Sequence, residues 1–150
     1  MSELRELAEP FPAAMVEKAP VGKFGSYVTH SNYTQRALSI LGPHTFGAVD
    51  LIRGYAPAIK TENNSWPARE NAVVGVVAEL TVTIDGKEVT ITEIGTEDNP
   101  AMKHDAECAK NALSDAYKRC WMRVGLGLHL WSKKPRDYFL AIQLDKEEEQ

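Results

Sequence analysis

The sequence predicts an α+β fold in which a three-stranded antiparallel sheet is packed by one long helix. Three observations carry this prediction. Residues 74 to 84 alternate between apolar and polar side chains and lead into Asp85-Gly86, a preferred two-residue hairpin turn. Residues 49 to 60 form an earlier strand-like segment. Residues 102 to 131 repeat apolar side chains at three- and four-residue steps, which is the period of a helix.

The predicted hairpin has a definite register. A two-residue turn brings the strand that begins after Gly86 back along the first one. Both strands then place their apolar side chains on the same face, which supports this register over a one-residue slip. The expected cross-strand pairs are Val82 with Val89, Leu80 with Ile91 and Thr81 with Thr90.

The predicted long helix has an apolar stripe that can bind the sheet. Pro100 is expected at its start, where a missing N–H costs nothing, and Gly125 and Gly127 at its end. Its C-terminal half is expected to present cations. The stripe consists of Ala106, Ala109, Leu113, Ala116, Tyr117, Cys120 and Val124.

The remaining segments complete one domain of 150 residues, a length sufficient for a single buried core. Prolines interrupt residues 1–20, which indicates an arm that docks its apolar side chains elsewhere. A short strand at 27–28 is expected to precede a helix capped by Ser31 or Asn32 and ended by Gly42.

Further along the chain, Pro57 argues for an edge or a bend in the strand at 49–60, and residues 61–71 are expected to form a loop. Residues 132–136 are a basic connector, 138–144 a possible final strand, and 137–150 a C-terminal extension with an acidic tail.

Charge is unevenly distributed along this acidic chain, whose net charge is −4. Residues 101 to 136 contain eight basic and three acidic side chains, whereas acidic residues concentrate at both ends. This pattern excludes indiscriminate coating of nucleic acid but allows a local basic surface. It indicates either a partner for the basic segment or a solvated helix face.

The two cysteines favour an intracellular protein. Cys108 and Cys120 are twelve residues apart on the predicted helix and out of phase, so they cannot pair there. We therefore expect reduced thiols. No secretory leader and no apolar run of membrane length is seen, so we expect a cytoplasmic protein without membrane association.

Motifs of common enzymes are missing, including the P-loop, GxSxG, HExxH and the dinucleotide fingerprint. His104 and Cys108 could supply half a metal site, but no second pair at a useful spacing is present. A nuclease could use carboxylates of the hairpin, although Glu79 and Glu93 are expected to be out of step with the apolar face and exposed to water. The candidate nuclease carboxylates are Glu79, Asp85, Glu88 and Glu93.

Lys118 and Arg119, with Arg123 close by, have a clearer physical use. Such cations neutralise phosphates and release counterions, which gives salt-sensitive binding with little sequence preference. Adjacent helical residues point about 100° apart, so the pair could straddle a groove with the sheet as its floor. Tyr117, Trp121 and Trp131 could stack on bases, although the first two are more simply core or subunit-interface residues.

At these residues the chain resembles the single-strand annealing proteins of the Rad52 type, including the bacterial DdrA and phage Sak-like branches. The likeness spans about residues 10 to 130. Its matching segments are Pro10-Phe11-Pro12, Tyr27-Val28 with the helix ending at Gly42, VGVVAELTVTIDG at 74–86, and NALSDAYKRCWMRVGLG at 111–127.

The resemblance implies a β-β-β-α core that assembles into rings, with a basic groove holding single-stranded DNA by its backbone and its bases outward. Lys118 and Arg119 match the family's backbone-contacting pair. The next basic position of the family falls at Met122, with Arg123 one residue later, and a family arginine falls at Asn32, for which Arg36 could substitute. The predicted DNA-binding residues are Lys118, Arg119, Arg123, Lys110, Arg36, Asn32 and Arg53.

We therefore expect an ATP-independent single-strand annealing protein of recombination and repair that is not an enzyme and needs no cofactor. Its expected partners are single-stranded DNA, the complementary strand, copies of itself, and a single-strand binding protein or recombinase. The resemblance places it in a bacterial nucleoid or a phage-infected host cell. The alternatives are an end-protecting protein without annealing activity, a metal-dependent nuclease, and an oligomeric scaffold for acidic proteins.

Overall fold

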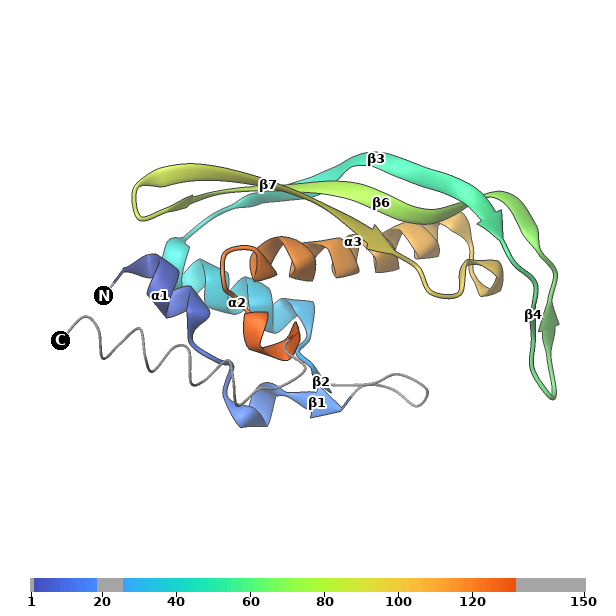
Figure 1. Cartoon of the computed structure of the whole chain (residues 1–150), viewed down its shortest axis with the longest axis horizontal. Helices are drawn as coiled ribbons and strands as arrows, with labels where there is room; N and C mark the ends of the chain where they lie inside the picture. Colours follow the sequence, from blue (N-terminus) through green and yellow to red (C-terminus); the bar gives the residue numbers. More distant parts are fainter. Residues whose placement is uncertain (1, 19–25, 132–150) are drawn as a thin grey trace.

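A computed structural model describes residues 2–18 and 26–131 of the chain. It confirms the α+β class: one antiparallel sheet lies against helices that all cover the same face (Figure 1). Its helices are α1 (Glu3–Ala8), α2 (His30–Leu41) and α3 (Asp105–Met122), with 3₁₀ turns η1 (Ala13–Met15), η2 (Pro100–Met102) and η3 (Leu128–Trp131). Its strands are β1 (Glu17–Lys18), β2 (Ser26–Tyr27), β3 (Thr45–Ala56), β4 (Ile59–Lys60), β5 (Ser65–Trp66), β6 (Arg69–Ile84) and β7 (Lys87–Thr96).

The main sheet has the order β3-β6-β7, with the hairpin strand β6 in the centre. The predicted cross-strand pairs at Val82, Thr81 and Leu80 are all confirmed. Asp85 and Gly86 in the turn have φ angles of 50° and 78°, as a two-residue hairpin turn requires. The register follows because a one-residue slip would turn the apolar side chains away from the helices.

β3 differs from its predicted bounds at both ends. It begins at Thr45 and ends at Ala56, because Pro57 cannot donate to the ladder. β4 follows and pairs with β5, and β5 lies inside the segment 61–71 that we expected to be a loop. This small hairpin extends away from one end of the sheet (Figure 1).

The long helix is shorter than its apolar pattern suggested. Pro100 begins the separate 3₁₀ turn η2, and α3 starts at Asp105. It ends before Gly125 and Gly127, whose φ angles of 96° and 73° favour glycine. Ala106 is exposed, contrary to the predicted stripe. The buried face of α3 consists of Cys108, Ala112, Ala116, Tyr117, Cys120 and Trp121.

Close contact between α3 and the sheet depends on a glycine. A Cβ at Gly95 of β7 would lie 1.9 Å from the Ala112 carbonyl oxygen and 2.6 Å from the Ala116 nitrogen. Gly95 and the small alanine side chains therefore let the helix backbone approach the strand directly. This contact positions the whole length of α3, including its cations.

The N-terminal segment packs into the core, as its apolar residues suggested. Leu7 of α1 is fully buried and Phe11 is 4% exposed. Asp85 accepts hydrogen bonds from the backbone N–H groups of Glu3 and Leu4, so the hairpin turn caps the start of α1. α2 begins at His30 after Thr29, so neither Ser31 nor Asn32 is the N-cap.

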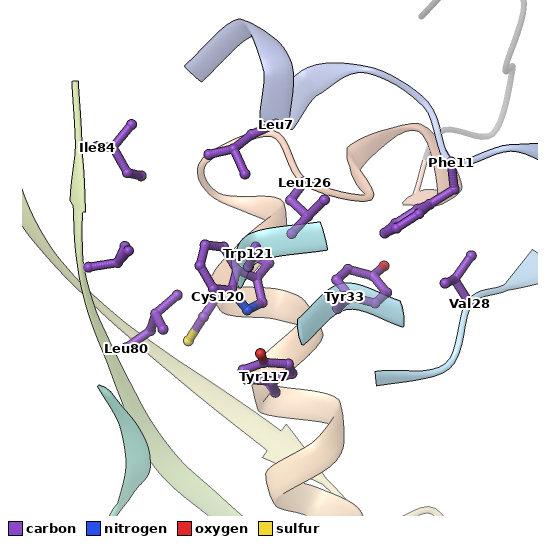
Figure 2. Packing of buried hydrophobic residues seen from close by; sticks show 12 residues of the cluster. Leu7, Phe11, Val28, Tyr33, Leu80, Ile84, Tyr117, Cys120, Trp121 and Leu126 are labelled. Carbon is purple, nitrogen blue, oxygen red and sulfur yellow. The ribbon is translucent and has the colours of Figure 1, made fainter. Parts of the chain in front are cut away.

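Aromatic and aliphatic side chains from the sheet, α2, α3 and the N-terminal segment meet in one core (Figure 2). Trp121 and Tyr33 are the largest fully buried side chains, and Tyr117 is 7% exposed. Tyr117 and Trp121 are thus core residues, as the simpler interpretation had it. Cys108 and Cys120 are buried free thiols, and burial raises the pKa of Cys120 to about 11.

Three predicted segments fall outside the described residues. They are the basic connector at 132–136, the possible strand at 138–144 and the acidic tail.

Candidate nucleic-acid interface

Lys118 lies on α3 where this helix faces β2 and the start of α2. Its ammonium nitrogen is 5.5 Å from the ring centroid of Tyr27 and 6.0 Å from that of Tyr33. Partial burial lowers the pKa of Lys118, and nearby Asp115 acts in the opposite direction. Within residues 2–18 and 26–131 it forms no ion pair, so an incoming anion would meet a cation held by aromatic faces.

Arg119 is fixed from two sides. Its Nε donates to Asp115 Oδ2 at 3.0 Å, and its guanidinium carbon lies 4.7 Å from the Trp131 ring centroid. Asp115 in turn accepts a hydrogen bond from the Thr96 N–H at the end of β7. Arg119 is therefore oriented by the sheet edge and by η3, while its side chain stays about 38% exposed.

Arg123 pairs with Glu93, whose carboxylate oxygen lies 2.5 Å from the arginine Nε. This position of Glu93 corrects our expectation, because Glu93 lies opposite the buried Ala78 and shares the helix-facing side of the sheet. Glu79, the next residue after Ala78 on β6, faces the other way. Asp85 caps α1, so these carboxylates do not converge.

Two other predicted DNA-binding residues, Arg36 and Asn32, lie on α2. Arg36 donates to the backbone oxygens of Glu6, Glu9 and Pro10, which ties α2 to the C-terminal end of α1. Asn32 lines a small pocket that it shares with Arg36.

Arg53 donates to Asp105 at the opposite end of α3. The pKa of Asp105 is lowered, first by a hydrogen bond from the Val73 N–H and then by Arg69. This cluster joins the start of α3 to the sheet, a role that the sequence did not indicate for Arg53.

Lys110 stands two turns before Lys118 on α3, at a cavity of about 650 Å³. Residues of α2, α3 and the beginning of β3 line this open cavity, and no sequence pattern pointed to it. Lys110 is exposed and forms no ion pair within the described residues. Lys110, Ser114 and Lys118 thus follow one row of four-residue steps on the helix, and because this row is inclined to the axis the two lysines differ in direction by about 80°.

The described residues offer no group of three or more metal-ligating side chains, and His104 is an exposed residue just before α3. None of the described helices combines the length and apolarity needed to cross a membrane.

Fold and interface together define an α+β protein with cations ordered along one helix, a surface suited to an anionic polymer. A family model described as "Rad52/22 family double-strand break repair protein" matches residues 52–148, nearly two thirds of the chain. The chain belongs to this family, which confirms the resemblance, although the match does not single out the DdrA or Sak-like branch. No curated protein matches the chain. Family membership gives it a role in DNA repair and recombination, and proteins of this family bind DNA and self-associate.

Proposed function

We propose that this protein anneals complementary single strands of DNA without nucleotide hydrolysis. It holds each strand by the sugar–phosphate backbone, along a basic groove that a ring-like oligomer repeats from subunit to subunit. The observation that carries the proposal is the adjacent pair Lys118 and Arg119, each oriented by aromatic rings on a helix fixed to the sheet.

The pair suits phosphate binding because both cations are positioned before a ligand arrives. Lys118 gains from a phosphate because partial burial has removed part of its hydration. Arg119 keeps donors available beside its bond to Asp115, since a guanidinium has five N–H groups. Contacts of this kind leave base edges free to meet a second strand.

Self-association reconciles an acidic chain with DNA binding. One subunit holds few phosphates and would bind weakly, whereas a ring joins many weak sites into a continuous path. Strands held along that path are kept free of hairpins, and pairing itself supplies the driving free energy. We propose that the predicted protein partners, a single-strand binding protein or a recombinase, deliver or receive the strand.

The binding step is tested by measuring the affinity for a labelled single-stranded oligonucleotide over a series of salt concentrations. The variant Lys118→Ala/Arg119→Ala should bind many sequences more weakly. The slope of log K against log salt should become shallower by roughly 0.7 for each phosphate that the variant no longer neutralises. Lys60→Ala/Lys87→Ala is the matched control, since it removes two exposed lysines from β4 and β7. Equal affinity of the wild type and the first variant would refute the assignment of the groove.

A further inference from the structure

The cavity beside Lys110 has the size and lining of a small-molecule site rather than of a packing defect. Its volume of about 650 Å³ lies within the range of ligand pockets. Phe46 and Tyr117 form an aromatic wall, with ring centroids 4.8 Å apart in an edge-to-face arrangement. Leu113 adds an apolar side chain from the same helix.

Polar groups of the cavity form two hydrogen-bonded groups. Tyr117 Oη lies 2.6 Å from Thr34 Oγ1 and 3.0 Å from His44 Nε2. Nearer the start of α2, Ser114 Oγ lies 3.3 Å from His30 Nδ1. Hydroxyl and imidazole groups can both donate and accept, so the lining can meet a planar heterocycle with a mixed hydrogen-bonding edge.

The cavity lies beside the row that contains Lys110 and Lys118 on α3. Lys110 and Ser114 line it, and Lys118 follows one turn beyond Ser114. Eight residues of helix separate the two lysines by about 12 Å. A single strand whose phosphates contact both lysines therefore passes the cavity between them.

We propose that this cavity is a nucleobase pocket that takes one unstacked base of the bound single strand per subunit. Lys118 and Lys110 hold phosphates on either side, while the base inserts beside Phe46 and Tyr117. The inference rests on the proposed function, because it requires a strand on α3. One inserted base would set the strand's position on each subunit and leave the bases between pockets free to pair.

The test compares two oligomers of equal length and charge: oligodeoxythymidylate and the same chain made of abasic nucleotides. Stacking of a base on aromatic side chains predicts at least about fivefold tighter binding of the base-bearing oligomer by the wild type. Ser114→Trp and Leu113→Trp fill the cavity from two positions and should bring this ratio close to one. Ala106→Trp is the matched control, because Ala106 is exposed on α3 and does not line the cavity.

The outcomes separate the pocket from the proposed function. If the wild type binds the base-bearing and the abasic oligomer with nearly equal affinity, the pocket proposal is wrong. It is also wrong if a filled variant with a native circular dichroism spectrum keeps the wild-type ratio of the two affinities. Lys118→Ala/Arg119→Ala should weaken both oligomers alike. If neither oligomer binds the wild type, the proposed function fails as well. If the filled variants change the sedimentation profile without DNA and keep the ratio, the cavity receives a neighbouring subunit and the proposal is wrong.

Discussion

The guanidinium carbon of Arg119 lies 4.7 Å from the ring centroid of Trp131, nine residues after the end of α3. Through this contact η3, which follows α3 in the chain, packs back against the C-terminal half of α3. It gives Arg119 a second restraint besides Asp115, and it leaves Trp131 about 38% exposed next to a cation. The aromatic ring thereby orders a candidate phosphate ligand.

Trp131→Ala should weaken binding to single-stranded DNA about two- to fivefold, because a partly exposed cation–π contact is worth about 0.5–1 kcal/mol. Fluorescence anisotropy with a labelled oligonucleotide measures this change. Trp131→Phe should recover part of the affinity. Leu128→Ala is the control, since Leu128 lies in the same 3₁₀ turn with equal exposure. A Trp131→Ala protein with wild-type affinity would show that the stack does not support Arg119.

Gly95→Ala should destabilise the protein by about 2 kcal/mol or more, because its Cβ would overlap the backbone of α3. Urea denaturation measures the free energy of unfolding. Gly47→Ala in β3 is a matched control, since a Cβ there has nothing within 4 Å, and it should stay within about 1 kcal/mol of the wild type. Similar losses in the two variants would contradict the packing of α3 on β7.

Acidification should destabilise the fold through His44 and His129. Burial lowers the pKa of both imidazoles, and the positive Arg36 lowers that of His129 further. The unfolded chain then binds protons more readily below about pH 6.5, so the free energy of unfolding should fall as pH drops from about 7.5 to about 5.

His44→Gln should make this fall shallower while keeping a partner for the Tyr117 hydroxyl. Urea denaturation at several pH values provides the measurement, and His104→Asn controls for the loss of an exposed imidazole. If the free energy of unfolding falls with decreasing pH as steeply in His44→Gln as in the wild type, His44 does not contribute to the pH dependence.

Local patterns predicted the parts of the fold that local chemistry determines. The β6–β7 register followed from alternation and the Asp85-Gly86 turn, and the end of α3 followed from two glycines. Helix starts were less predictable, because Thr29 and Ser31 are both good capping residues. Ala106 was assigned to the buried face, but it is exposed, because the side of α3 that packs on the sheet runs through Cys108 and Ala112 instead.

Long-range contacts were beyond a single sequence. Arg36 and Arg53 looked like free cations until the structure placed α1 and Asp105 beside them. Glu93 follows Val89 and Ile91 at two-residue steps, so the alternation of the strand already indicated that Glu93 faces the helices. A carboxylate on that face became plausible only with Arg123 opposite. The apolar patterns of the two helices gave no indication of the cavity between α2 and α3.

The most direct test mixes complementary oligonucleotides that carry a donor and an acceptor dye and follows energy transfer with the full chain, without ATP. We predict faster pairing than in buffer alone, and loss of this acceleration in Lys118→Ala/Arg119→Ala but not in Lys60→Ala/Lys87→Ala. Pairing that the wild-type protein slows would indicate strand protection instead. Acceleration that persists without Lys118 and Arg119 would contradict the central claim.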